Sequence, residues 1–369
     1  MGTDGLRPYV PDLAAEWLLE TPGALHRAVE GSMVMADISG FTPLTERLTR
    51  LGVVGSEELS DILDSTFAAL LDQARPEGAD LLKWGGDAVL LLFRGPDHAS
   101  RAVRASLGMR RTLRLVGRTR SSAGQVRLRM SVGVHSGSFD LFLVGDPGEH
   151  RELVVAGPAS TRVAELESAA DAGQVAVSPR TARLLPPSTV AADPGGLLLV
   201  RRAPHGTSSR ASPDGTTDGV DVGVLLPPPL REHLRSGARE PEHRAVAVAF
   251  VEFSGVDALH RERGTAALGA ALDDLVRRVQ EACRRDGVTF LESDINRDGG
   301  KIMLVCGAPR RAEDVEARIV RAVRDVVDLD GPLRLRAGIN RGRVFASDFG
   351  PDFRRTYSVK GDAVNLAAR

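Results

Sequence analysis

The sequence is poor in several residue types, and each shortage excludes a class of protein. Two cysteines, Cys283 and Cys306, are too few for a disulfide framework or a cysteine-rich zinc site. The longest apolar runs, 88–93 and 245–251, are far shorter than the roughly 20 residues of a membrane-spanning helix. The N-terminus shows no basic segment followed by an apolar one, so no signal peptide is predicted. We therefore expect a cytoplasmic protein with no membrane partner.

An excess of charge of one sign is also missing. The chain has 48 Lys and Arg against 49 Asp and Glu, which gives a net charge of -1. A nucleic-acid-binding surface would need a basic patch or stripe, so we expect no nucleic-acid partner. The composition, 42% hydrophobic and 26% charged, is that of a globular protein, and 369 residues suggest about two domains.

Lysine is the scarcest charged residue. Only Lys83, Lys301 and Lys360 are lysines, and the other 45 basic residues are arginines. All three lysines lie inside motifs that occur twice. One interpretation is drift from lysine to arginine with three chance survivors. The other is that a compact ammonium is needed at these positions, where a planar guanidinium does not fit.

The chain carries an internal repeat. Three segments of the first half, 33–41, 82–90 and 153–159, return in the same order in the second half, at 248–255, 297–304 and 357–365.

The two copies differ at complementary positions. Two aspartates of the first copy become Glu252 and Gly300 in the second, and an asparagine and an arginine of the second copy correspond to Thr161 and Glu165 in the first. Complementary losses of this kind predict one site assembled from two halves.

The hydrophobic patterns predict an α+β fold with a mainly antiparallel sheet and helices on one face. In the first copy we expect strands at 31–38, 80–83, 88–93, 126–136, 154–157 and 174–178, with helices at 43–51, 59–71, 98–116 and 159–169. The predicted division is an N-terminal segment 1–30, with a short helix at 13–19, a first copy 31–202, a linker 203–242 and a second copy 243–369. The second copy stops inside a helix that the first copy continues past, so we expect a fragment of a longer protein.

The two aspartates predict a metal site. Asp37 ends the first strand, and Asp87 follows two glycines in a hairpin. Two close carboxylates repel each other and burial raises their pKa, which divalent cations would relieve. Carboxylates together with substrate phosphates are the usual ligands of Mg²⁺. Alternatively, Asp37 caps a helix and Asp87 is a turn residue.

The stretch Ile38-Ser39-Gly40-Phe41-Thr42 runs from the strand end into a helix N-terminus. Its backbone N–H groups and the helix dipole would hold an anion such as a triphosphate. In the second copy, Asn365 and Arg369 are four residues apart and share one helix face. Such a pair can orient a sugar and neutralise a phosphoryl group, although a solvated helix face is the alternative.

Taken together, the segments 36–42, 83–87 and 357–369 resemble class III nucleotidyl cyclases. The chain is similar to the tandem subgroup of soluble adenylyl cyclase and its bacterial relatives, over about 31–180 and 243–369. The resemblance implies two ferredoxin-like cyclase domains that form an intramolecular pseudo-symmetric dimer, so that a monomer suffices for catalysis.

The resemblance also implies a reaction, the attack of the ribose 3′-OH of ATP on the α-phosphorus with pyrophosphate leaving. Asp37, Asp87 and the Ile38 carbonyl would bind two Mg²⁺ or Mn²⁺ ions. Asn365 would orient the ribose and Arg369 would stabilise the α-phosphate. In addition, two basic side chains are candidate phosphate ligands, Lys83 and, more weakly, Arg162.

Base selection departs from the adenylyl cyclase pattern. A lysine is expected on the strand before the second hairpin, and none is present there. Glu292 with Ser358 would instead mimic the guanine-reading pair of guanylyl cyclases. The tandem context favours ATP, and GTP is the alternative.

Two further interpretations stay open. The chain could be a nucleotide-sensing module with little turnover that regulates a C-terminal effector, or a diguanylate cyclase, which the helix at 357–369 disfavours. The second cavity, with Glu252, Gly300, Thr161 and Glu165, is expected not to catalyse. By resemblance it could bind a small regulator such as bicarbonate.

Overall fold

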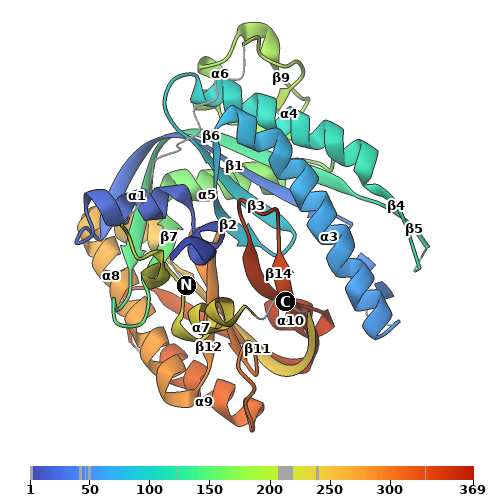
Figure 1. Cartoon of the computed structure of the whole chain (residues 1–369). Coiled ribbons are helices and arrows are strands. Elements are labelled where there is room, and N and C mark those ends of the chain that lie inside the picture. Colours follow the sequence, from blue (N-terminus) through green and yellow to red (C-terminus); the bar gives the residue numbers. More distant parts are fainter. Residues whose placement is uncertain are drawn as a thin grey trace.

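The structure, a computed structural model, describes residues 3–40, 44–45, 47–48, 51–122, 124–206, 219–237, 241–328 and 330–369. The described residues form two α+β domains that face each other, the first running from blue to green and the second from orange to red in Figure 1.

The first domain is built on one large sheet. Its main elements are β1 (His26–Ser39), α3 (Val53–Ala74), β2 (Ala79–Gly85), β3 (Ala88–Phe93), α4 (His98–Val116), β6 (Arg129–Val144), β7 (Glu152–Ala156), α5 (Pro158–Ala169) and β8 (Val175–Val177). The strand order is β2-β3-β1-β6-β8, with β7 also paired to β6. All of these pairings are antiparallel except that of β6 with β8.

The second domain repeats this arrangement. Its elements are β11 (Glu242–Ser254), α8 (Val256–Asp286), β12 (Thr289–Asn296), β13 (Gly299–Cys306), α9 (Val315–Val327), β14 (Arg334–Phe349), β15 (Thr356–Lys360) and α10 (Asp362–Ala368). Its strand order, β12-β13-β11-β14-β15, matches β2-β3-β1-β6-β7 of the first domain. The predicted α+β class, the mainly antiparallel sheets and the duplication are therefore confirmed.

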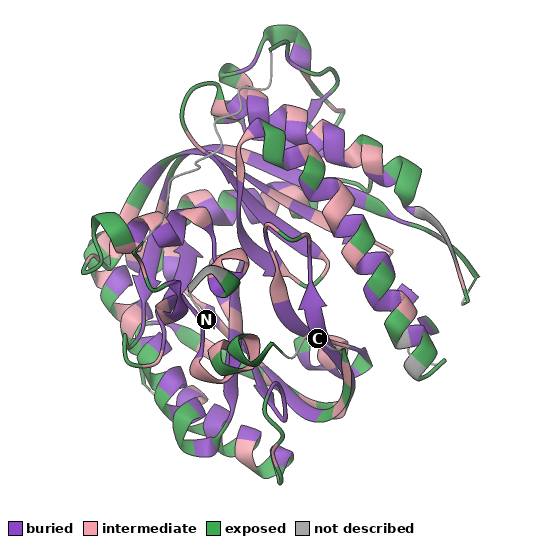
Figure 2. Ribbon diagram, viewed as in Figure 1, coloured by how far each residue is buried: buried purple, intermediate pink, exposed green. Residues whose placement is uncertain are grey.

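Each sheet buries both faces. One face packs against the domain's own helices, α3 and α4 in the first domain and α8 and α9 in the second. The opposite faces meet in a shared core, in which Leu82 and Leu153 of the first domain pack with Val248, Leu291 and Tyr357 of the second. The buried strands between the two layers of helices are visible in Figure 2. Because apolar area is removed from water on both sides, docking of the domains is part of folding.

The N-terminal segment fastens the two domains together. It contains η1 (Thr3–Tyr9) and α1 (Asp12–Glu20), which confirms the helix predicted near 13–19. The Tyr9 hydroxyl donates to Asp348 Oδ2 of the second domain at 2.6 Å. Arg354 of the second domain donates to the carbonyls of Leu81, at 3.0 Å, and of Pro8, at 3.2 Å. The linker adds a short helix, α7 (Pro228–Ser236).

Several predicted boundaries were wrong. β1 begins at His26 rather than at residue 31, because 26–30 pair with a longer β6. The strand predicted at 126–136 is interrupted at Leu128: β5 (Gly124–Arg127) pairs with β4 (Arg118–Ser121) in a separate hairpin before β6 begins.

The strand predicted at 174–178 is also not the last of its domain. After β8 come α6 (Pro179–Arg183), η3 (Pro187–Thr189), β9 (Val190–Ala192) and β10 (Leu198–Val200), and the two strands extend the sheet beyond β8. Within the linker, η4 (Val222–Leu225) precedes α7, and in the first domain η2 (Arg75–Glu77) follows α3.

None of the described helices combines the length and the apolar character needed to cross a bilayer.

Candidate functional site

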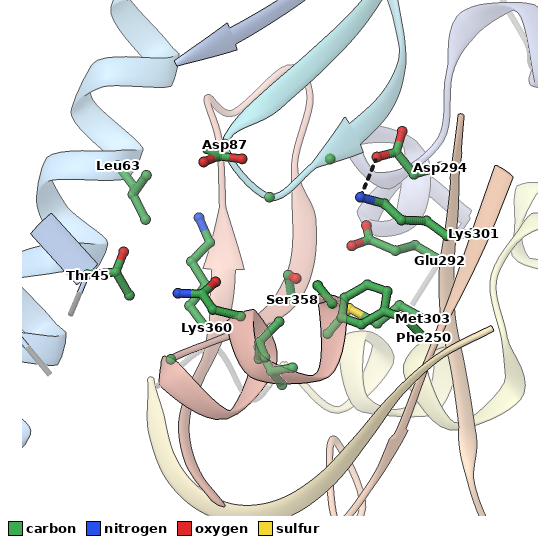
Figure 3. Close-up of a pocket in the computed structure, with 17 residues that line it drawn as sticks. Thr45, Leu63, Asp87, Phe250, Glu292, Asp294, Lys301, Met303, Ser358 and Lys360 are labelled. Carbon is green, nitrogen blue, oxygen red and sulfur yellow. Dashed lines mark ion pairs between the residues drawn. The ribbon is translucent and has the colours of Figure 1, made fainter. Parts of the chain in front are cut away.

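A cavity lies between the two domains at the β2–β3 hairpin. Its empty volume is about 870 Å³ with solvent-open space included. The first domain contributes the hairpin 85–87 with Thr45 and Leu63, and the second contributes β12, β13, the end of β15 and α10. Figure 3 shows Asp87, Thr45 and Lys360 toward one end of it and Glu292, Asp294 and Lys301 toward the other.

The two aspartates predicted to bind metal are held on neighbouring strands. Asp37 lies opposite Ala88 in the β1–β3 pairing, and the Ile38 amide donates to the Asp87 carbonyl at 2.9 Å. Gly86 has a φ of 73°, a conformation that favours glycine, which lets the hairpin turn tightly before Asp87. Asp87 borders the cavity, whereas Asp37 is not among its lining residues.

Burial makes this carboxylate pair costly to ionise. Burial, and next the Asp87 carboxylate, raise the pKa of Asp37 to about 7. Burial also raises the pKa of Asp87. A divalent cation would remove this penalty, and oxygen donors suit Mg²⁺ or Mn²⁺. The described residues contain no group of three or more metal-binding side chains. One or two carboxylates together with substrate phosphates are a usual arrangement for Mg²⁺.

The predicted anion-binding stretch follows β1. Ile38 is buried, and the Ser39 hydroxyl donates to the Arg129 carbonyl at 3.3 Å. Gly40 has a φ of 102°, and Phe41 and Thr42 lie outside the described residues, as does the predicted helix start at 42–43. Arg129 was not predicted. It lies on β6 opposite Ser39, and Ser131, two positions further along β6, lies opposite Asp37. Because alternate residues of a strand point to the same face, Arg129 and Asp37 belong to the same face of the sheet.

The second domain brings Asn365 to the same cavity. Asn365 lies on α10 and borders the cavity together with Val364 and Ala368. Arg369 caps this helix, is exposed and is not among the lining residues, although its neighbour Ala368 is. The structure thus brings Asp87 and Asn365 together, one from each copy.

The opposite end of the cavity is acidic. Glu292, Asp294 and Ser358 border it. Burial, and next the Asp294 carboxylate, raise the pKa of Glu292 to about 8. Burial also raises the pKa of Asp294, whose Oδ2 lies 3.7 Å from the Lys301 ammonium. A Cβ at Gly85 would come within 2.5 Å of that same oxygen, so the first domain's hairpin closes directly over Asp294.

Two predicted phosphate ligands lie elsewhere. Lys83 is buried on β2, where its Nζ donates to Glu152 Oε1 at 2.5 Å and to Ser293 Oγ at 3.0 Å. It does not border this cavity, because the interface carboxylate Glu152 already holds its ammonium. Arg162 is exposed on α5, paired with Glu165 at 3.0 Å, and does not border the cavity either.

The strand register explains the position of Lys83. Lys83 lies opposite Leu90, and Glu292 lies opposite Met303 in the second domain. Each follows an irregularity in the pairing of its strand, so Lys83 is the structural counterpart of Glu292.

Sequence reasoning missed the roles of Lys301 and Lys360. Both border the cavity. From the sequence alone, each was equally compatible with an ordinary surface charge. The signal that could have found them is the scarcity of lysine itself, since every lysine of the chain lies at the domain interface or at this cavity.

In the second domain, the residues that correspond to the two aspartates do not form a carboxylate pair. Glu252, the counterpart of Asp37, forms an ion pair with Arg336 at 2.6 Å, and Arg336 lies opposite it on β14. Gly300, the counterpart of Asp87, has no room for a side chain, because a Cβ would lie 2.6 Å from the Asp294 carbonyl and from the Phe253 ring. Thr161 accepts a hydrogen bond from the Asp298 amide at 3.1 Å.

Comparison with known proteins gives the chain its relatives. A family model described as the adenylate and guanylate cyclase catalytic domain matches residues 26–207 and 238–369. Human adenylate cyclase type 10 is 22% identical over 412 residues, which cover 98% of this chain and 25% of the human protein. The mouse protein of the same name is 25% identical over 227 residues, which cover 60% of this chain and 13% of that protein. The chain therefore spans a quarter or less of the length of these relatives.

The fold has a counterpart among solved structures. A class III adenylyl cyclase-like ATP-binding protein from Pseudomonas aeruginosa superimposes with a TM-score of 0.62 at 15% identity, covering 93% of this chain and 81% of that one. At this identity the likeness concerns the fold, and it extends over both domains.

Proposed function

Because the chain belongs to the adenylate and guanylate cyclase catalytic-domain family, as a tandem class III cyclase, we propose that it converts ATP to cyclic AMP and pyrophosphate at a single site between its domains. In this reaction the ribose 3′ oxygen forms a bond to the α-phosphorus, the bond from that phosphorus to the β-phosphate oxygen breaks, and the 3′-hydroxyl loses its proton. The observation that carries the proposal is that Asp87 of the first copy and Asn365 of the second border one cavity.

The residues of the first domain serve the phosphates. Asp37 and Asp87, with the Ile38 carbonyl, would hold Mg²⁺ or Mn²⁺, which would supply Lewis-acid chemistry by lowering the pKa of the nucleophile and drawing off charge. Ser39 and Gly40 follow Asp37 along the chain and would offer backbone N–H groups to the phosphates.

The residues of the second domain serve the sugar and the transition state. Asn365 orients the ribose so that its 3′ oxygen faces the α-phosphorus, which holds this intramolecular attack in a favourable geometry. Arg369 neutralises charge that develops on the phosphoryl group.

GTP is a second candidate substrate, favoured by the placement of Glu292 and Ser358. An ionised carboxylate accepts hydrogen bonds from the N1–H and the exocyclic amine of guanine. A protonated carboxyl has one donor and one acceptor, which suits adenine N1 and its amine. Because the pKa of Glu292 is raised to about 8, the protonated form is the main one at neutral pH, and this supports ATP.

The test is product formation from ATP and from GTP in Mn²⁺, with wild type compared with Asp87→Asn. We expect cyclic AMP from wild type and a loss of at least about 10²-fold in the variant, since the substitution removes a group that acts in the transition state. Isothermal titration with a non-reactive ATP analogue runs alongside. Binding without product from either nucleotide would contradict the cyclase and leave the nucleotide-sensing module.

A further inference from the structure

The three lysines of the chain have different surroundings. Lys83 is held by Glu152, and Lys301 lies 3.7 Å from Asp294 at the Glu292 end of the cavity. Lys360 is the last residue of β15 and lies toward the Asp87 end, as Figure 3 shows. Among the residues that the structure describes, no carboxylate reaches ion-pair distance of the Lys360 ammonium, while the other two lysines each have one.

An aromatic ring supports Lys360. Its Nζ lies 3.9 Å from the centroid of the Phe349 ring, and the Phe67 ring centroid is 6.0 Å away. An ammonium over the face of a ring is stabilised by the negative charge of that face, more so where water is excluded. Arginine also stacks on aromatic faces, so the ring alone does not explain why a lysine stands at this position.

The charges around Lys360 come from several elements. The acidic groups that act on its pKa, each in the direction that raises it, are Asp87 of the hairpin, Glu292 of β12 and Asp64 of α3. Asp64 is already engaged, because its Oδ1 accepts the Gly350 amide at 2.6 Å. Burial lowers the pKa of Lys360 to about 8, as expected for an ammonium that lacks a close counter-charge.

We infer that Lys360 binds the phosphate chain of the nucleotide, beside the cations proposed at Asp37 and Asp87. The inference rests on the proposed function and deepens it. Lysine binds phosphate as a compact point charge, and the Asp87 end of the cavity is where the phosphates would lie if the base occupies the Glu292 end. Lys301, by contrast, holds Asp294 in place at the base end.

The experiment compares ligands that differ only in phosphate. Binding of adenosine, AMP and a non-reactive ATP analogue is measured in Mn²⁺ for wild type, Lys360→Met and Lys360→Gln. The matched control is Lys301→Met, the other cavity lysine. We expect the Lys360 variants to bind the triphosphate at least about tenfold more weakly, because a hydrogen bond to a charged group is lost, while adenosine affinity is unchanged. In Lys301→Met, the ATP analogue should bind more tightly than adenosine by the same factor as in wild type. Lys360→Arg should restore part of the triphosphate affinity that the other Lys360 variants lose.

Inorganic triphosphate separates this inference from the proposed function, because it needs no base pocket. If wild type binds inorganic triphosphate and the Lys360 variants do not, the inference holds even if no nucleotide is cyclised. Triphosphate affinity equal to wild type in folded Lys360→Met or Lys360→Gln would overturn it. So would an equal loss for adenosine and the triphosphate, which would mean that Lys360 only shapes the cavity. Thermal unfolding shows which variants are folded.

Discussion

Asp37 carries a charge that the fold penalises. Its pKa is about 7 in the folded protein because of burial and of Asp87, against an ordinary value near 3.8. The folded state therefore binds this proton more tightly than the unfolded chain does. The stability that this proton provides is present below about pH 4 and is lost as the pH rises through about 7.

We predict that Mn²⁺ raises the melting temperature more at about pH 8 than at about pH 5.5, because only the ionised Asp37 binds the cation well. Thermal unfolding with and without Mn²⁺ at both pH values measures this. In Asp37→Asn the extra shift at high pH should disappear. Equal shifts at the two pH values in wild type would contradict a cation site at this pair.

Glu292 is predicted to decide the purine. Glu292→Gln presents one donor and one acceptor at every pH, so this variant should keep ATP and reject GTP. In wild type, the ratio of kcat/KM for GTP to that for ATP should rise between about pH 7 and pH 9 as Glu292 ionises. The groups that act on Glu292 are Asp294, Lys83, Glu152 and Lys301, and they are unchanged in the variant. A ratio that varies with pH equally in Glu292→Gln would show that another group makes the choice.

At the scale of elements, one buried network joins β2 and β7 of the first domain to β12 of the second. Glu152 accepts from Lys83, from Ser293 Oγ at 2.6 Å and from the Ser293 amide at 3.2 Å. Burial opposes ionisation of Glu152, but Lys83 and His150 lower its pKa to about 2. Since Ser293 lies between Glu292 and Asp294, this network also fixes the base end of the cavity.

We predict that Lys83→Met destabilises the protein by about 3 kcal/mol or more, because Glu152 is left as a buried, unpaired charge. The double variant Lys83→Met/Glu152→Leu should recover most of this loss, since no buried charge remains. Urea unfolding of the single and double variants measures both effects. Arg278→Gln, which breaks a surface pair with Asp274, is the control and should change little. A double variant as unstable as the single one would mean that Lys83 matters through packing alone.

Most helices and strands of the two domains could be predicted from the sequence, because the pattern of each one occurs in both copies of the repeat. The hairpin around Gly85 and Gly86, the helix of Asn365 and the strand of Asp37 all follow from local patterns. The hairpin of β4 and β5 did not, because its residues are mainly polar and show no alternating apolar pattern. Nor did the start of β1 at His26, because its pairing partner on β6 is distant in the sequence. The place of Lys83 was missed for the same reason, since its partner Glu152 belongs to another strand and Ser293 to another domain.

At the scale of the whole molecule, the two halves of the site belong to one chain. The shared core that includes Leu82, Val248 and Tyr357 holds the domains face to face, and the N-terminal segment bridges them through Tyr9 and Asp348. In the proposed function, one chain therefore supplies both halves of the site.

We predict that two inactive variants, Asp87→Asn and Asn365→Ala, do not restore activity when they are mixed. Each chain carries one damaged site, and the undamaged half of one chain cannot reach that of another while both are docked internally. The measurement is cyclic AMP formation by the mixture at rising total concentration. Recovery toward a quarter of wild-type activity would show that sites form between chains by exchange of domains.

The ion pair of Glu252 with Arg336 and the crowding at Gly300 determine how hard it would be to build a second metal site in this molecule. An aspartate introduced at position 300 would overlap the Phe253 ring. The guanidinium of Arg336 would still be paired with Glu252, at the place where a cation would have to bind. Building a carboxylate pair in this half of the molecule would therefore require changes at more than one position, with Phe253 and Arg336 altered together with Gly300.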